Sequence, residues 1–210
     1  MTRHGLLWLI TIIAIFLFAP LVVSQAEYKA CIDSEITAAS EWYGNDELGE
    51  ILDRTKGIYH LLMVKTGIDT GLRKHFVKPI PSEVAPGVEM PKYLAGYADH
   101  LMGYWGSLLY NIWLFCFRLA HSWTWIVFLA PFLVATIFDG VMTRKAKLSS
   151  FRYTSPTVYN LSWHLIIAMA AISLVAFAVS IPLSVLSYPL VLTGMGLLIR
   201  LVISNIQHSA

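Results

Sequence analysis

The charges of this chain fall in blocks, and long uncharged stretches lie between them. The first stretch, residues 5–23, holds nineteen residues, and as a helix at about 1.5 Å per residue it nearly covers a hydrocarbon core of ~30 Å. Residues 123–138, 161–181 and 183–199 are also uncharged. The pattern predicts an all-α membrane protein with four transmembrane helices and a helical periplasmic segment between the first and the second.

The first stretch allows two interpretations. Arg3 before it and the small residues Ser24 and Ala26 after it are typical of a secretory signal that is cleaved. Its apolar part is longer than the ~7 to 15 residues of an ordinary signal core, which favours an uncleaved transmembrane anchor over residues 5–23. Cleavage after Ala26 would leave three spans.

A second choice concerns two neighbouring apolar stretches. Residues 102–119 are interrupted by Arg118, and the next stretch begins at Trp123. Arg118 and His121 suit the membrane surface better than its centre, because there they can reach lipid head groups or a partner. We therefore predict an interfacial amphipathic helix over 101–121, transmembrane helices over 122–141, 159–181 and 183–203, and a basic cytoplasmic loop over 142–158.

Charge asymmetry predicts the orientation. Residues 24–100 carry twelve acidic and eight basic side chains. The segment 142–158 has no acidic residue and four basic ones, and two further arginines flank the outermost spans. With four spans all six basic groups fall on one side, which the positive-inside rule identifies as the cytoplasm. We expect a multi-pass protein of a bacterial inner membrane with both termini cytoplasmic and residues 24–100 in the periplasm.

Helical periodicity continues in the periplasmic segment. Apolar residues recur every three or four positions over 48–62, which predicts an amphipathic helix ending at Gly67. Shorter helices are predicted over 34–43 and from Asp69, as its N-cap, to Phe76. Four prolines follow, so residues 78–92 are predicted to be an extended Pro-rich linker.

The sequence gives no local support for catalysis, a cofactor or a metal. The seven histidines are scattered, with no pair three or four residues apart, and nucleophile and phosphate-loop motifs are absent. His164 lies one turn into the third span, where a structural role is favoured over a proton path. Cys31 and Cys116 are expected to be unrelated thiols rather than a bridge. We expect a protein that is not an enzyme.

Three features are candidate interaction surfaces. Aromatic residues recur along the predicted interfacial helix, where they can anchor the helix in lipid or form a docking groove. Small residues in the last two spans predict close helix contact, within the hairpin or with another protein. The basic loop is expected to attract anionic lipid, not to bind nucleic acid directly, and Asp139 to pair with Arg144 or Lys145. The candidate partner-interaction residues are Trp42, Tyr43, Tyr104, Trp105, Trp113, Arg118, Asp139, Arg144, Lys145, Lys147, Arg152, Gly194 and Gly196.

Several short motifs resemble one family of membrane proteins. They are Glu41-Trp42-Tyr43-Gly44, the stretch RTKGIYHLLMV over 54–64 with Thr66-Gly67, and Phe138-Asp139-Gly140 leading to Arg144-Lys145 and residues 155–159. With the N-terminal anchor, the chain resembles the TraJ-like inner-membrane proteins of conjugative plasmids and integrating conjugative elements. The resemblance implies DNA transfer between bacteria through contact with the TraD-type coupling ATPase of a type IV secretion system, without catalysis.

Two hypotheses on function therefore remain. The first is a non-enzymatic subunit of a conjugative machine, whose partners are the coupling ATPase or other secretion subunits, with membrane lipid around it and an oligomer possible. The alternative is an auxiliary subunit of a transporter or channel that uses His164 and Arg118 along a polar path. Replacement of His164 by Leu separates the two, because only a polar path depends on that side chain.

Overall fold

The computed structural model describes residues 3–72, 92–150 and 153–206. The Pro-rich linker predicted over 78–92 lies outside the described residues except for its last residue. The chain forms two compact units. Unit 1 comprises Met1–Ala120 and Phe177–Pro182, and unit 2 comprises His121–Ala176 and Leu183–Ala210. Each unit is helical, and helix α5 (Lys92–Ser149) contributes to both.

Unit 1 begins with the apolar helix α1 (Arg3–Val22), which ends two residues after Pro20. Helix α2 (Gln25–Tyr43) follows at an angle of 112°. Its start is fixed by a capping box, in which Ser24 accepts a hydrogen bond from the Glu27 N–H while the Glu27 carboxylate accepts one from the Ser24 N–H at 2.8 Å. Five of the nineteen residues of α2 are charged, which is more than a transmembrane helix usually carries.

The rest of the polar segment folds into three short helical pieces. Gly44 has φ 82°, a conformation that favours glycine, and separates α2 from α3 (Asn45–Tyr59). The chain continues as a π-helix, η1 (His60–Val64), closed by a bond from the Lys65 N–H to the His60 carbonyl at 2.9 Å. The short helix α4 (Ile68–Leu72) comes next. Because α4 starts one residue before Asp69, that residue is not the N-cap which the sequence predicted.

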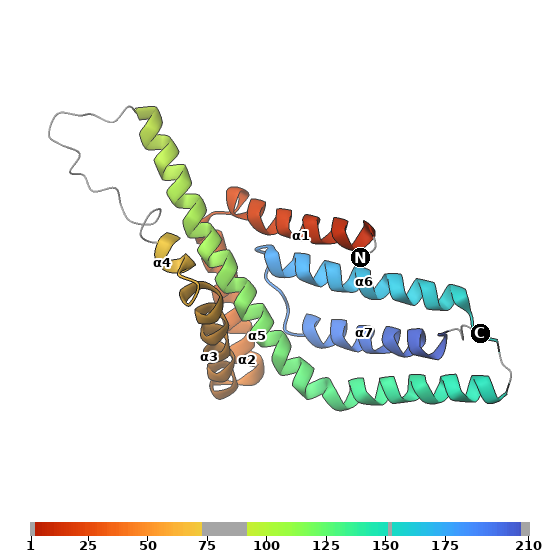
Figure 1. Ribbon diagram of the computed structural model, residues 1–210. Coiled ribbons are helices and arrows are strands. Elements are labelled where there is room, and N and C mark those ends of the chain that lie inside the picture. Colours follow the sequence, from red (N-terminus) through yellow and green to blue (C-terminus); the bar gives the residue numbers. More distant parts are fainter. Residues whose placement is uncertain (1–2, 73–91, 151–152, 207–210) are drawn as a thin grey trace. The chain divides into compact units, whose positions relative to one another are not determined.

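Helices α2 and α3 pack on the N-terminal half of α5, as Figure 1 shows. Two adjoining clusters of buried side chains hold them together. One joins Ala39 and Ile51 to Phe117 and Ala120, and the other joins α2 to Leu114. The apolar stripes that predicted amphipathic helices are therefore the surfaces buried in the core of unit 1.

Helix α5 is continuous over 58 residues. The sequence placed a boundary at 121–122 and a loop from 142, whereas the helix runs through both positions. Between Trp105 and Pro131 the sequence has a single glycine, Gly106, and no proline, and the polar side chains near 118 are accommodated by packing, so nothing stops the helix there. Arg144, Lys145 and Lys147 consequently lie on the last turns of α5 rather than in a loop.

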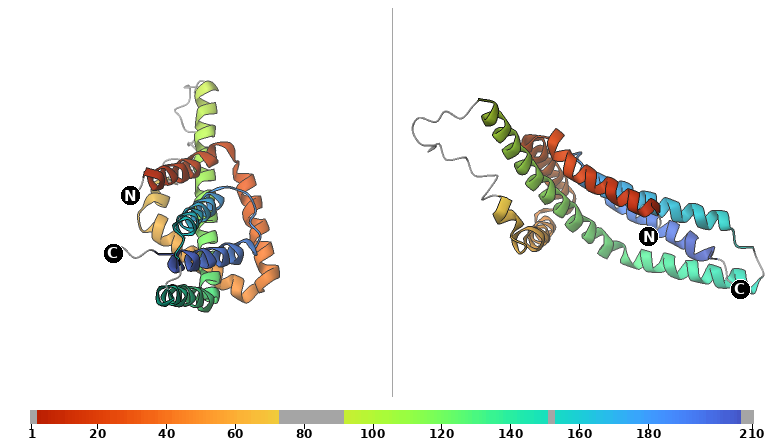
Figure 2. Two further views of the ribbon diagram at one scale, coloured as in Figure 1. Left: turned by 90° about the vertical axis from the view of Figure 1, so that its right-hand side faces the viewer. Right: turned by 45° about the horizontal axis from the view of Figure 1, so that its top comes forward.

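Unit 2 contains the C-terminal part of α5 together with α6 (Pro156–Ala178) and α7 (Ser187–Ser204), apart from the last two residues of α6. The three helices run side by side, and the left view of Figure 2 looks along them. In the described part of the chain, three helices are long and apolar enough to cross a membrane: Gly103–Ser149, α6 and α7. A fourth span is counted if α1 and α2, as a bent pair, form one. The prediction of an all-α, multi-pass membrane protein is confirmed.

Candidate functional site

The core of unit 1 contains a buried ion pair. Arg118 of α5 is 0% exposed and Glu35 of α2 is 4% exposed. The Nη2 of Arg118 lies 2.5 Å from Glu35 Oε1, and its Nε donates to both carboxylate oxygens at 3.1 and 3.2 Å. The geometry is that of a bidentate pair, in which two parallel N–H···O bonds join the guanidinium to the carboxylate. Such a pair fixes the position of α2 on α5.

Arg118 also binds the end of α6. Its Nη1 donates to the carbonyls of Phe177 and Val179 at 3.2 and 2.7 Å, and its Nη2 donates to the carbonyl of Ile181 at 2.7 Å. The last carbonyls of a helix have no partner within it and carry partial negative charge, so a guanidinium is a favourable cap. Arg118 thus connects three segments of unit 1: α2, α5 and residues 177–182.

Two polar residues of α2 line the same pair. The Cys31 thiol donates to Glu35 Oε1 at 3.8 Å, and its sulfur accepts from Arg118 Nη2 at 3.6 Å. Burial raises the pKa of the Cys31 thiol, and the neighbouring Glu35 carboxylate raises it further. Burial also raises the pKa of Tyr28 to about 12. Both groups are therefore held in their neutral forms at neutral pH.

The sequence placed Arg118 at the membrane surface, within reach of lipid head groups or a partner. The structure gives the guanidinium other partners: it is fully enclosed, and it donates to Glu35 and to backbone carbonyls rather than reaching out of unit 1. Sequence reasoning missed Glu35. Its signal was present: Tyr28, Ile32, Glu35 and Ala39 share one face of α2, and Glu35 is the charged member of that otherwise buried stripe.

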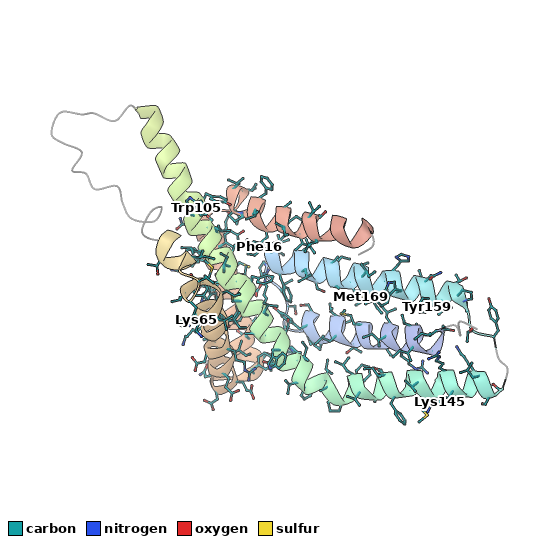
Figure 3. All side chains as sticks on the ribbon, in the orientation of Figure 1. Phe16, Lys65, Trp105, Lys145, Tyr159 and Met169 are labelled. Carbon is teal, nitrogen blue, oxygen red and sulfur yellow. The ribbon has the colours of Figure 1, made fainter. Side chains whose placement is uncertain are left out.

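The aromatic candidates of α5 divide between two roles. Trp113 stacks on Phe117 with ring centroids 5.7 Å apart and packs against the core. The Tyr104 hydroxyl donates to the carbonyl of Leu17 in α1 at 3.2 Å, and the Trp105 ring meets that of Tyr104 edge to face. Figure 3 labels Trp105 on α5. These rings hold helices of the same chain together.

The two aromatic candidates at the end of α2 differ in exposure. Trp42 is 53% exposed, whereas Tyr43 packs against the core cluster of unit 1. Of this pair, Trp42 presents the large apolar surface that a partner or a lipid can cover.

The glycines of α7 face helices of their own unit. A Cβ on Gly194 would lie 2.9 Å from Met169 Cε of α6, and a Cβ on Gly196 would lie 3.0 Å from Leu133 Cδ2 of α5. Figure 3 shows Met169 on α6. Gly140, which sequence reasoning treated only as a span end, would bring a Cβ to 3.1 Å from the Arg200 carbonyl oxygen. The small residues therefore serve helix contact within unit 2.

The charged end of unit 2 is mostly paired. Asp139 forms an ion pair with Arg200 of α7, not with Arg144 or Lys145. The reason is geometric: side chains five or six residues further along a continuous helix do not share its face, whereas α7 presents Arg200 directly. The Nζ of Lys147 donates to the Ser204 carbonyl at 3.1 Å and to Asn205 Oδ1 at 2.9 Å.

Lys145 is the candidate on these turns whose side chain is exposed, and Figure 3 shows it near the end of α5. Arg144 is half-buried. Arg152 lies outside the described residues. Lys145 is therefore the basic group best placed to meet a partner.

Among the residues that the structure describes, no three His, Cys, Asp or Glu side chains gather where they could hold a metal ion. His164 is exposed on α6, and His121 stacks on Tyr188 with ring centroids 4.2 Å apart. Cys31 and Cys116 are buried, free thiols. In the described part of the chain, most of the candidate residues hold helices together, and Trp42 and Lys145 are exposed at the surface.

Comparison with known proteins identifies the family of the chain. No curated protein and no solved structure matches it. A family model described as "DtrJ-like: IncC plasmid conjugative DNA transfer protein DtrJ-like" matches residues 28–209. The match takes in most of α2, the Arg118–Glu35 pair and all three helices of unit 2. The chain therefore belongs to the DtrJ-like family of conjugative DNA transfer proteins, in agreement with the resemblance carried by its motifs.

Proposed function

We propose that the chain is a non-enzymatic inner-membrane subunit of a conjugative type IV secretion apparatus and that it docks the coupling ATPase. The observation that carries the proposal is the family match over residues 28–209, which makes the chain a conjugative DNA transfer protein. Its apolar helices support a place in the membrane component of such a machine. Plasmids and integrating conjugative elements are the genetic setting that the sequence motifs favour.

The absence of catalysis is part of this proposal. The buried charged side chains Arg118 and Glu35 of unit 1 bind each other, and Arg118 also binds backbone carbonyls, so this pair serves to attach helices. Transfer of DNA should then depend on Arg118 only through the amount of folded protein. A variant of Arg118 that keeps a wild-type level of folded protein in the membrane but abolishes transfer would contradict this part of the proposal.

We assign ATPase docking to the end of α5 that carries Lys145. Its ammonium group is exposed beside residues already engaged within unit 2, so a partner with an acidic surface can reach it without rearranging the helices. By the positive-inside rule this end is cytoplasmic, the side on which an ATP-driven enzyme works.

Co-purification from membranes in mild detergent tests the docking. The wild-type chain should bring down the coupling ATPase, and Lys145→Glu should lower the recovered ATPase several-fold. Lys29→Glu is the matched control, because Lys29 is an exposed lysine of α2 in unit 1 and its reversal should leave recovery unchanged. Recovery of the wild-type chain with no transfer protein, or equal losses for both variants, would reject the assignment.

A further inference from the structure

Unit 1 contains an open cavity of about 570 Å³ between two helical stripes. Lys56, Tyr59, His60 and Val64 line it from α3 and η1, and Gly106, Leu109, Tyr110 and Trp113 line it from α5. Gln25, at the start of α2, completes the wall. Both stripes have the spacing of one helix face, so the cavity is a product of how the helices fold and pack.

The lining is amphipathic in a definite way. Lys56 and His60 are four residues apart and exposed, and Gln25 adds an amide, so one part of the lining can bind an anion. Val64, Leu109 and Trp113 give an apolar wall, and two tyrosine rings lie between the two kinds of surface. Size and lining fit a ligand with an anionic head and a hydrocarbon chain.

The backbone at this cavity is unusual. His60 and Val64 are the two ends of the π-helix η1, which occurs here in place of the α-helical continuation of α3. Isolated π turns are rare and are found frequently at functional sites. The π turn leaves Leu61 and Leu62 exposed while Met63 is buried, so an apolar edge lies beside the cavity.

With α1 as the transmembrane anchor that the sequence predicts, the cavity comes near the end of that anchor and so near a membrane surface. The same stretch of α5 that lines it holds α1: the Tyr104 hydroxyl and the Asn111 amide donate to the carbonyls of Leu17 and Phe16. These residues are in the last two turns of α1, about 8–9 Å from its end at Val22 by helical rise. Exposed Leu61, Leu62 and Ile68 nearby, with Lys65 among them, match the mixed character of the bilayer interface.

We propose that this cavity binds one anionic phospholipid, with its phosphate at Lys56 and His60 and an acyl chain along Leu109 and Trp113. Lys56 pairs at 2.9 Å with Asp53, but both side chains are more than 70% exposed, so this pair is weak and a phosphate can displace it. The site belongs to unit 1 and does not depend on the coupling ATPase being the partner.

Native mass spectrometry of the full chain, released from nanodiscs of phosphatidylglycerol or of phosphatidylcholine, tests the proposal. The wild-type protein should retain one phosphatidylglycerol at least five times more often than one phosphatidylcholine. Lys56→Gln with His60→Gln should reduce that preference to about one. Lys29→Gln is the control, an exposed lysine that does not line the cavity, and should keep the wild-type preference.

A second variant separates binding in the cavity from adsorption to the surface. Val64→Trp adds volume at a half-exposed lining position and should lower retention of both lipids, while its circular dichroism stays that of the wild-type protein. Equal retention of the two lipids by the wild-type chain would overturn the proposal. So would unchanged retention in Val64→Trp, or a loss in Lys29→Gln as large as that in the double variant.

Discussion

Arg118 shows why a charge inside an apolar sequence does not by itself mark a side chain that is exposed to lipid head groups or to a partner. Desolvating a guanidinium is costly unless every donor finds an acceptor. Here the acceptors are one carboxylate and three carbonyls. The carboxylate lies 83 positions away in the sequence, and the carbonyls lie 59 to 63 positions away. The charge on α5 and the acidic interruption of the α2 stripe are each visible in the sequence, but their pairing is not, because nothing local links residues so far apart.

Removal of one member of this pair should be strongly destabilising. Arg118→Met leaves the Glu35 carboxylate buried without its partner, and we expect a loss of about 3–5 kcal/mol in the free energy of unfolding. The double variant Arg118→Met/Glu35→Leu should recover part of that loss, since no charge remains buried, although the carbonyls of Phe177, Val179 and Ile181 lose the guanidinium as donor. Denaturant unfolding in mixed micelles measures both. If the free energy of unfolding of Arg118→Met lay within about 1 kcal/mol of the wild-type value, the pair would not be enclosed as described.

Cys31 should react slowly and only in alkaline solution. Its pKa lies above the ordinary value of 9.0 because burial and Glu35 disfavour the thiolate, and the thiolate is the reactive form. In a Cys116→Ser background, alkylation by a maleimide at pH 7.5 should be at least tenfold slower in the folded protein than in the unfolded one, and the folded rate should climb as pH rises beyond 9.

The same raised pKa has a consequence for stability. When the pKa of a group is higher in the folded than in the unfolded state, that group's contribution to the free energy of unfolding is complete below the unfolded pKa. The contribution is lost as pH rises through the folded pKa. The free energy of unfolding should therefore fall from about pH 9 upward, where Cys31 and then Tyr28 begin to ionise in the unfolded chain. A flat stability profile between pH 8 and 11 would contradict the burial of both groups.

Among the elements, the apolar helices were predicted well because length and hydropathy are local properties. The sequence also predicted a break between an interfacial helix over 101–121 and a span from 122, and α5 has no such break. Polar residues near 118 suggested a helix end, whereas the folded chain gives Arg118 hydrogen-bond partners within the helix-packed core. The π turn at His60 leaves no trace in the apolar spacing of 48–62, because it changes the register only at the end of that stripe. The positions at which helices of unit 2 meet were suggested by their small residues, though Gly140 was not recognised.

A glycine pair distinguishes backbone contact from side-chain contact in unit 2. At Gly140 the nearest atom is a backbone oxygen of α7, which cannot move aside, whereas at Gly194 it is the end of a flexible methionine. Gly140→Leu should therefore cost about 1–3 kcal/mol and weaken the Asp139–Arg200 pair, while Gly194→Ala should cost clearly less. Thermal unfolding in detergent compares the two. Equal losses would mean that α5 and α7 are not in close contact.

For the whole molecule, family membership and the multi-pass architecture agree with what the sequence predicted. Orientation in the membrane remains a prediction from charge. A periplasmic reporter such as alkaline phosphatase should be active when fused after residue 74, and a cytoplasmic reporter should be active when fused after Lys145. Activity of both positions with the same reporter would remove the four-span topology, and with it the assignment of Lys145 to the cytoplasm.

Helix α5 is longer than a bilayer is thick. Its 58 residues extend about 87 Å along the helix path, and a hydrocarbon core of ~30 Å can enclose only about a third of that. Whichever turns the bilayer encloses, the others are left to head groups or water. A protein outside the bilayer can therefore bind the same helix that crosses it, and no additional globular domain is needed for that contact.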